Sequence, residues 1–416
     1  MLVLVGMYAG VHMLLSDFTI QLSKVELFPM IGVDFLISEE EELYFLEVNS
    51  IPAGAGIAKI VSGLIKLENY SNMNWVDLGE VILENIEKFL KTFLALKGIR
   101  LNNKPSVVMI EPKYDRLHVL KLDRLKILDY LRRKGFRTIS TSKQEIESSP
   151  NGLEVKLNNR KITPEVVLRR VTGVKIWSNH HQLVLNPSVA GKLSCNKFKV
   201  YEIIKNILRK TKLKLRVPIY RLARNEEELM WAIEEIKDFS KTVVLKPLDG
   251  YGGSGIKFIN IHAATKFKGK VDYPIIVQEM IKSYPLKGGD GHRYVFDVRG
   301  FIIGGLFSGL HIRRSGCPIK YNSNEKCFIS NISSGGAYVH AFYDDTLRGI
   351  EQVKLLRDYS TVVPGLPKIE KKVVIFGKDI IGVISEASKH ISTALIRELI
   401  VWTVNNRRNN IGDVAL

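Results

Sequence analysis

One stretch of the sequence combines a lysine with nearly bare backbone, which suits the binding of phosphate. The apolar run Val243 to Leu245 leads to Lys246, and four glycines follow between positions 250 and 255. Glycine permits positive φ and lets backbone amides approach an anion closely. The pattern predicts a strand followed by a phosphate-binding loop, with Lys246, Gly252, Gly253 and Ser254 as candidate ligands. A flexible hairpin tip is the alternative, and no Gly-Lys-Ser/Thr follows to make a Walker loop.

A second stretch, near the start of the sequence, offers oxygen ligands for a metal ion. Asp34 lies in the apolar segment 32–37, and Glu47 and Asn49 lie in a second apolar segment after an acidic turn. Two strands joined by that turn would put the three side chains on one face, since residues two apart on a strand point the same way. Three oxygen donors suit a hard cation whose other ligands are phosphate oxygens. A surface hairpin is the alternative.

Polar residues farther along could complete such a site. Residues 275–277 are typical of a buried strand, and Gln278 and Glu279 at its end form a hinge whose backbone could hydrogen-bond an adenine. The planar guanidinium groups of Arg293 and Arg313 could each donate two parallel hydrogen bonds to a carboxylate or phosphate. Asn331 lies just before a Ser-Ser-Gly-Gly turn. Arg293 could equally be a surface residue, and Asn331 a plain turn former.

These segments together resemble the ATP-grasp superfamily. The phrase Leu-Lys-Pro-Leu-Asp-Gly-x-Gly-Gly from Leu245 is most similar to glutathione synthetase, and Asn-Ile-Ser-Ser-Gly-Gly from Asn331 is similar also to the ribosomal-protein glutamate ligases. The spacing of Asp34, Glu47 and Asn49 matches the metal hairpin of the family, which there follows the Asn…Gly-Gly segment. Here the hairpin comes first. The resemblance therefore implies a circularly permuted ATP-grasp fold of α+β or α/β class, in which two antiparallel-sheet subdomains hold ATP and a small α/β domain precedes them.

The resemblance also implies a role for each candidate. Lys197 and Lys246 would neutralise the α- and β-phosphates, the glycine loop would cover the β- and γ-phosphates, and Gln278 and Glu279 would bind adenine. Asp34, Glu47 and Asn49 would hold Mg²⁺, or Mn²⁺ in its place. Arg293, Arg313 and Asn331 would steady a carboxylate or an acyl phosphate. Lys197 is preferred over Lys199, although spacing alone does not separate them.

We expect four regions along the chain. Residues 1–97 would be the permuted part with the metal hairpin, 105–190 the small α/β domain, 191–281 the nucleotide-binding subdomain and 282–416 the rest of the large subdomain with a C-terminal helix. The polar stretch 97–104 would link the first two. In a rival arrangement, the hairpin is the remnant of a separate unit and completes the site of another chain.

Periodicity predicts individual elements within these regions. Apolar residues at helical spacing predict helices over 17–30, 75–96, 117–134 and 380–404, and alternation predicts a turn at Arg299-Gly300 between two strands. Residues 338–366 show no sharp period.

Composition limits the partners and the compartment. The net charge of +18 leaves nucleic acid and acidic substrates open, but the basic run 196–216 has few aromatic residues for base stacking, so we do not expect a nucleic-acid partner. The apolar opening, residues 1–15, is too short to span a bilayer. Cysteines 195, 317 and 327 contain no Cys-x-x-Cys pair, and we expect an unpaired structural role in a reducing compartment, the cytoplasm. His180-His181 lack a third ligand and are expected in a loop.

The function that best fits this sequence is an ATP- and Mg²⁺-dependent ligase. It would join a carboxylate to an amine through an acyl phosphate and release ADP and phosphate. The substrates would be small molecules or peptides and could be acidic, and an oligomer is left open. The alternatives are an ATP-binding regulatory or scaffold protein without activity, and a basic RNA-binding protein with a glycine loop.

Overall fold

The computed structural model describes most of the chain after residue 29. The described residues are 30–65, 75–111, 118–149, 152–157, 160–171, 176, 182–185, 188–249, 253–264, 271–319, 325–332, 335–355 and 368–412. The expected helix over 17–30 lies outside them except for Met30, which begins a strand. No helix among the described residues is long and apolar enough to cross a bilayer.

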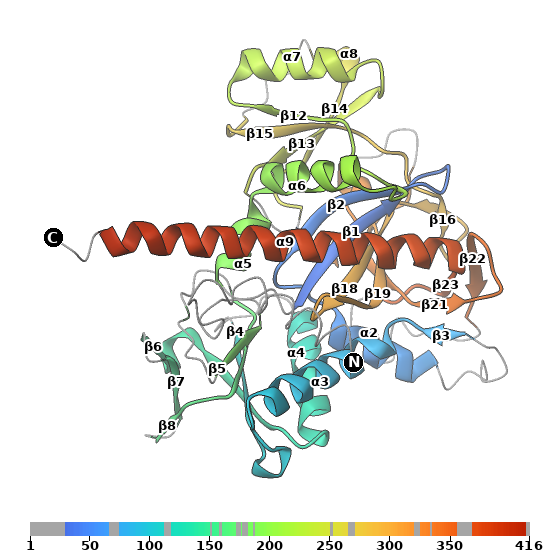
Figure 1. Cartoon of the computed structure of the whole chain (residues 1–416). Coiled ribbons are helices and arrows are strands. Elements are labelled where there is room, and N and C mark those ends of the chain that lie inside the picture. Colours follow the sequence, from blue (N-terminus) through green and yellow to red (C-terminus); the bar gives the residue numbers. More distant parts are fainter. Residues whose placement is uncertain are drawn as a thin grey trace.

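The largest sheet draws its strands from three distant stretches of the chain. Its order is β11-β2-β1-β18-β19-β20, and its neighbours are antiparallel except β11 and β2. The strands are β1 (Met30–Ile37), β2 (Leu43–Asn49), β11 (Leu215–Arg216), β18 (Phe296–Ile303), β19 (Leu306–Arg314) and β20 (Ala337–Val339). The β1–β2 hairpin therefore sits beside strands that are more than half the chain away (Figure 1).

Helices cover both faces of this sheet, which explains why every residue of β1 and β18 is buried. Apolar residues of α6 (Lys197–Lys210) and α9 (Lys378–Gly412) pack on one face, in a core with Val33, Phe35 and Val298. Residues of α2 (Ala55–Ile65) and α3 (Glu80–Leu96) pack in another core with Met30 and Phe301. In Figure 1, α9 crosses the middle of the molecule as its longest helix.

A smaller antiparallel sheet carries the lysine and glycine stretch. Its order is β12-β15-β13-β14, and α7 packs against it around Ala232, Ile236 and Leu245. The bounds are β12 (Tyr220–Ala223), α7 (Glu226–Ile236), β13 (Thr242–Pro247), β14 (Lys257–Asn260), α8 (Ile261–Ala264) and β15 (Ile275–Glu279). Figure 1 shows this layer at the top, beyond α6 and the large sheet.

A parallel sheet of order β10-β9-β4-β5 forms the expected small α/β unit, with the helix α4 in its βαβ crossover. The antiparallel strands β6, β7 and β8 lie beside it. The bounds are β4 (Ser106–Glu111), α4 (His118–Arg133), β5 (Arg137–Ser142), β6 (Ile146–Ser149), β7 (Gly152–Leu157), β8 (Arg160–Ile162), β9 (Val166–Arg169), β10 (Leu183–Leu185) and α5 (Ser188–Cys195).

The remaining described strands form two further sheets. One has the order β22-β23-β21-β3, and β16 pairs with β17 alone. The bounds are β3 (Val76–Asp77), β16 (Leu286–Lys287), β17 (Arg293–Tyr294), β21 (Ala341–Asp344), β22 (Ile350–Lys354) and β23 (Lys372–Gly377). Two of these strands, β21 and β22, lie in the stretch 338–366 where the sequence showed no period.

Two predicted boundaries were wrong. The expected helix 75–96 begins only at Glu80, because Asp77 ends the short strand β3 and accepts the backbone N–H groups of Gly79 and Glu80, each at 2.9 Å. The turn expected at Arg299-Gly300 lies inside β18. The chain reverses instead at Gly304 and Gly305, whose φ values of 57° and 82° need glycine.

Candidate functional site

A row of ionisable side chains crosses the large sheet. Glu47 on β2 stands opposite Asp34 on β1, Asp34 opposite Arg299 on β18, and Arg299 opposite His311 on β19. Residues directly opposite on adjacent strands project from the same face. The sheet thus gathers ionisable side chains from two distant stretches, 34–47 and 299–311, on one surface.

A β-bulge puts Glu47 on that surface. Phe35 pairs with Phe45, but Asp34 pairs with Glu47, so Leu46 is an extra residue in β2. With strict alternation Glu47 would share a face with the buried Phe45; the extra residue turns it to the opposite face. The sequence spacing matched the hairpin, but it did not show this bulge.

Asp34 is buried between two arginines. Its Oδ1 accepts from Arg299 Nε at 2.6 Å, and its Oδ2 accepts from Arg299 Nη2 at 2.6 Å and from Arg313 Nη2 at 2.9 Å. Burial alone would raise the pKa of Asp34, but the charges and hydrogen bonds of Arg299 and Arg313 outweigh it and hold the pKa well below 3.8. Asp34 is therefore ionised at neutral pH.

Arg313 is shared by two carboxylates and reaches Asn331. Its Nε and Nη2 donate to Asp297 at 2.8 and 2.6 Å, and its Nη1 lies 3.3 Å from Asn331 Oδ1. Ser330 Oγ donates to the same Asp297 carboxylate at 2.6 Å. Ser330 and Asn331 thereby attach the segment before the glycine turn to the Arg313–Asp297 ion pair.

Tyr201 joins the hairpin to the small sheet. Its buried hydroxyl lies 2.9 Å from the Leu46 carbonyl oxygen and 2.8 Å from Gln278 Oε1, to either of which it can donate, and 3.3 Å from Lys246 Nζ, from which it accepts. Leu46 is the bulged residue beside Glu47. A single side chain of α6 thus connects β2, β13 and β15, and the hairpin meets Lys246 within one chain.

The charges of Glu47 and Lys246 each affect the pKa of the other. Burial and the neighbouring Asp34 raise the pKa of Glu47, against the opposing charges of Lys197, Arg299 and Lys246. Burial lowers the pKa of Lys246 to about 8, with Lys197 adding to this and Glu47 opposing it. Both side chains remain partly exposed, whereas Asp34 is 1% exposed. A ligand would therefore meet Glu47 and Lys246 before it met Asp34.

The two candidate lysines in the first turn of α6, Lys197 and Lys199, differ in their surroundings. Lys197, the first residue of the helix, is 8% exposed and acts electrostatically on both Glu47 and Lys246. Lys199 is exposed and pairs with Glu398 at 3.5 Å. Asn196, preceding the helix, accepts the Lys199 amide and caps it. Of the two lysines, Lys197 is the one in position to reach a ligand.

The described part of the glycine loop touches the segment that follows Arg313. Gly253 has φ of 77°, and a methyl group there would lie 2.8 Å from Asn331 Nδ2 and 3.0 Å from Ile329. Just beyond, Phe258 and Phe328 stack with ring centroids 5.2 Å apart. Ser254 is exposed, and Gly252 lies outside the described residues.

The predicted hinge uses much of its own hydrogen-bonding capacity. Gln278 is 3% exposed and contacts Tyr201, and Glu279 accepts the Ile219 amide at 2.8 Å. The amides of Glu279 and Met280 donate to Ile219 and Thr242. Adenine recognition by Gln278 and Glu279 stays a prediction.

The donors at the hairpin fit a magnesium ion that is also bound by phosphate. Asn49 Oδ1 accepts the Ile51 amide at 2.9 Å and keeps a second lone pair, and Glu47 is a carboxylate whose pKa a cation would lower. Asp34 would have to share its oxygens with two guanidinium groups. No group of three His, Cys, Asp or Glu side chains that could hold a metal ion occurs among the described residues, so two carboxylates and an amide would need phosphate oxygens to complete the shell.

Asp34, Asp297, Arg299 and Arg313 form one charged cluster, of which Asp297 and Arg299 were not predicted from the sequence, and the predicted Arg293 lies outside it. Asp297 and Arg299 are two apart on one strand, so alternation could have placed them on one face. They were overlooked because Arg299-Gly300 was interpreted as a turn. Arg293 lies on β17 with an exposed side chain, for which the structure gives no ion pair with a described residue.

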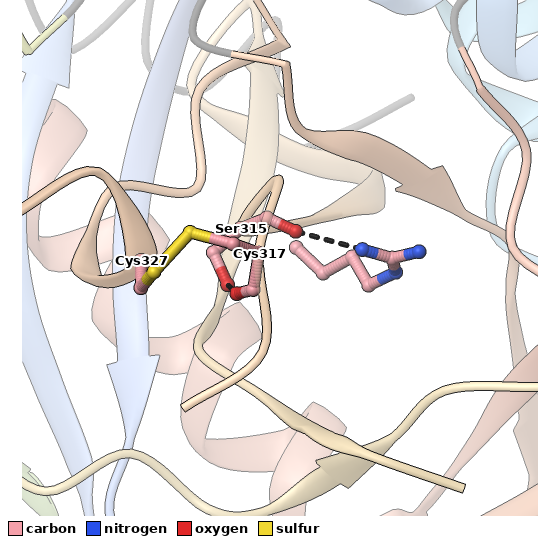
Figure 2. Close-up of a disulfide and its surroundings, with 4 residues drawn as sticks. Ser315, Cys317 and Cys327 are labelled. Atoms are coloured by element: carbon pink, nitrogen blue, oxygen red, sulfur yellow. Dashed lines mark hydrogen bonds between the residues drawn. A yellow bond between two sulfur atoms is a disulfide. The ribbon is translucent and has the colours of Figure 1, made fainter. Parts of the chain in front are cut away.

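The expectation of unpaired cysteines was wrong for two of the three. Cys317 and Cys327 form a disulfide, with Cα atoms 4.9 Å apart (Figure 2). Ser315 Oγ, beside it, donates to the Cys317 carbonyl at 2.9 Å. The spacing of ten residues is not a recognised motif, and only the fold brings the two together. The bond closes a loop within the segment that connects Arg313 to Ser330, both of which donate to Asp297.

Comparisons with known proteins extend this description. No family model matches the chain. A candidate gamma-glutamylcysteine synthetase from Methylobacillus flagellatus KT superposes with a TM-score of 0.57 at 12% identity, over 95% of this chain and 94% of that one. The chain has the ATP-grasp fold.

Other likenesses are weaker or shorter. A glutathione synthetase-like effector from Globodera pallida reaches a TM-score of 0.47 at 11% identity, over 68% of this chain and 72% of that one. An uncharacterized protein of Methanocaldococcus jannaschii is 29% identical over 115 residues, and the match spans 27% of each chain. Within this fold, the Tyr201 hydroxyl links the large sheet to the smaller one.

Proposed function

We propose that this chain is an ATP-dependent carboxylate–amine ligase. The observation that carries the proposal is the meeting of the β1–β2 hairpin with Lys246, through the Tyr201 hydroxyl and the electrostatic coupling of Glu47 to both lysines. An acidic hairpin opposite a lysine pair is what a magnesium nucleotide requires. The likeness to ligases in the ATP-grasp fold supports the same activity.

The roles follow from where each side chain lies. Lys197 and Lys246 would neutralise phosphate charge, and the loop containing Gly253 and Ser254 would cover the terminal phosphates. Glu47 and Asn49, with Asp34 behind them, would hold Mg²⁺, which when bound would neutralise phosphate oxygens. A transfer of this kind depends on positioning and charge stabilisation more than on a protein nucleophile.

The ligase reaction would have two steps, a phosphoryl transfer and then an acyl transfer. A substrate carboxylate oxygen attacks the γ-phosphorus and ADP leaves, giving an acyl phosphate; an amine then attacks the acyl carbon and inorganic phosphate leaves. Arg299 and Arg313, held by Asp34 and Asp297, would stabilise negative charge during both steps. Asn331 is bonded to Arg313 and would serve the same oxygens. Arg293 remains a weaker proposal for this role.

The permuted chain order is part of the proposal. It is supported by the register of β1 against β18, which puts the hairpin in the sheet of its own chain. The boundaries at 97, 105, 190, 191, 281 and 282 remain predictions, and β11 of the third region pairs with β2 of the first. A cytoplasmic location also stays a prediction, which the oxidation state of Cys317 and Cys327 in cells would test.

The deciding experiment supplies ATP, Mg²⁺ and panels of carboxylates and amines, and measures release of ADP and phosphate. Lys246→Ala and Asp34→Ala should abolish turnover, while Lys199→Ala, on the surface, should retain it. Unchanged turnover in both site variants would refute the assignment.

One observation favours a second candidate. Asp34 is already neutralised by Arg299 and Arg313, as in a site that binds nucleotide without a metal. A regulatory ATP-binding protein would bind ATP tightly with no turnover over the whole panel.

A further inference from the structure

The connection that leaves the hairpin, residues 50–57, is held by hydrogen bonds at both of its ends. After β2, the Ile51 amide donates to Asn49, and the Pro52 carbonyl accepts from Arg170. The amides of Gly56 and Ile57, which open α2, donate to Asp123 Oδ1 at 2.7 and 3.2 Å. Asp123, which holds the end of the connection at Gly56 and Ile57, belongs to the parallel-sheet unit and is more than sixty positions away in the sequence.

Asp123 and Arg170 form one buried clamp. Asp123 on α4 is 0% exposed, and its Oδ2 lies 3.0 Å from Arg170 Nη2, just after β9. One carboxylate oxygen therefore caps the N-terminus of α2, where negative charge is favourable. The other fixes the guanidinium whose second nitrogen holds Pro52. The two ends of the connection are tied through a single ion pair.

Packing leaves the connection no room to shift. A methyl group at Gly56 would lie 2.1 Å from the Asp123 carbonyl oxygen, and one at Gly54, whose φ is 112°, would lie 2.0 Å from His311 Cε1. On β1, a methyl group at Gly32 would lie 2.8 Å from the Pro52 side chain. The connection therefore packs closely against α4, β19 and β1.

We propose that Asp123 and Arg170 are positioning residues for the magnesium-binding end of the hairpin. The inference rests on the proposed function, because it concerns the same nucleotide site. Neither residue belongs to the row that would meet the nucleotide. They act through the backbone of residues 50–57, which sets where Asn49 and Glu47 stand. Ligands must be held to within a fraction of an ångström, and supporting residues typically change metal affinity or activity about 10- to 100-fold when removed.

The test measures binding as well as turnover. Mg²⁺-dependent binding of the β,γ-imido analogue of ATP is titrated by calorimetry for the full-length protein and for Asp123→Ala, Asp123→Asn and Arg170→Lys. Asp123→Ala should raise the Mg²⁺ concentration needed for half-maximal analogue binding roughly 10-fold or more. The affinity for the analogue at saturating Mg²⁺ should change little. Asp123→Asn keeps an oxygen for the two amides and should recover much of the loss.

A matched glycine pair separates this effect from general destabilisation. Gly56→Ala forces a methyl group against Asp123 and should reproduce the Mg²⁺ defect. Gly63→Ala lies on the same helix, where nothing stands within 4 Å of the added methyl group, and should behave as wild type.

Two results would overturn the inference. One is an Asp123→Ala protein that melts earlier but, below its melting temperature, binds Mg²⁺ and analogue as wild type does. The other is an equal defect in Asp123→Asn and Asp123→Ala with none in Gly56→Ala. If the wild type binds the magnesium nucleotide but joins no substrates, the ligase assignment fails while these binding data still decide the role of the clamp.

Discussion

Asp34 and Arg299 stand opposite each other on β1 and β18 and form a two-point ion pair, with both nitrogen–oxygen distances at 2.6 Å. They are 1% and 4% exposed. The geometry is the parallel fork that an arginine and a carboxylate make most favourably. It ties the N-terminal hairpin to the later strands of the sheet and orients the guanidinium that faces the site.

Removing the charge of Asp34 should be costly. Asp34→Asn would leave the buried Arg299 without its paired carboxylate and Arg313 with Asp297 alone, and breaking a buried pair in this way typically costs about 3–5 kcal/mol. Chemical denaturation measures this loss. Glu42→Gln, which removes the partner of the exposed Arg216, should cost at most about 1 kcal/mol. Equal losses in the two variants would show that the Asp34 cluster contributes nothing special.

The two arginine candidates should separate in activity. Arg299→Lys loses the fork to Asp34 and should reduce kcat about 100-fold or more, on the scale seen when one preorganised donor is removed. Arg293→Ala alters an exposed strand residue and should stay within about 3-fold of wild type by the same scale. Steady-state kinetics with the substrates found in the ligase assay would check both. The reverse ranking would restore Arg293 as the catalytic arginine.

Nucleotide affinity should depend on pH through Lys246. Since burial lowers the pKa of Lys246 to about 8, the free protein loses this cation as pH rises from 7 to 9, and affinity for ATP should fall. Lys246→Arg stays charged and should flatten the curve. Calorimetric titration across this range is the measurement.

The same pKa shift predicts the sign of a stability effect. Between about 8 and 10.5 the unfolded chain binds the Lys246 proton more tightly than the folded chain. The free energy of unfolding attributable to this group should therefore rise with pH in that window. Lys246→Met should remove that rise.

Two glycines with left-handed backbone should respond differently to alanine. Gly253 and Gly335 have φ of 77° and 87°, so each substitution costs about 1–2 kcal/mol of backbone strain. Only at Gly253 would the methyl group also meet Asn331 and Ile329, whereas nothing lies within 4 Å at Gly335. Gly253→Ala should therefore lower ATP affinity more than Gly335→Ala does. Equal affinities would mean that the contact between the loop and Asn331 is unimportant for nucleotide binding.

The disulfide should contribute measurably to stability. Closing the loop between Cys317 and Cys327 is expected to stabilise the fold by about 2–4 kcal/mol. A reductant should lower the melting temperature of the wild type and of Cys195→Ser, but not that of a Cys317→Ser/Cys327→Ser double variant. A double variant that still responds to reductant would place the effect elsewhere.

The sequence was most informative where chemistry and strand period coincided. The strand leading to Lys246 and the two strands of the hairpin could be recognised because apolar runs end in residues suited to phosphate or metal. Single-strand alternation also predicted the shared face of Glu47 and Asn49. Their alignment with Asp34 depends on the bulge at Leu46, which comes from pairing and leaves no mark in the residue types.

Buried charge was the main cause of the errors. Arg299-Gly300 was predicted to be a turn between two strands. An arginine inside a buried strand is costly unless it is paired, and its partner Asp34 is 265 positions away. Nothing in the sequence singled out Tyr201, whose hydroxyl bridges β2 and Lys246. The pairing of Cys317 with Cys327 likewise arises from the path of the chain.

The position of β1 in the large sheet has a consequence for how the protein folds. Met30 aligns with Ile303, so during translation the apolar hairpin is made long before its neighbour β18 leaves the ribosome. Sheets built from such remote pairings have high contact order and form slowly, and an unpaired edge can aggregate in the interval. Until β18 is made, the β1 edge that will bind it has no strand partner, so chaperone dependence should centre on this hairpin.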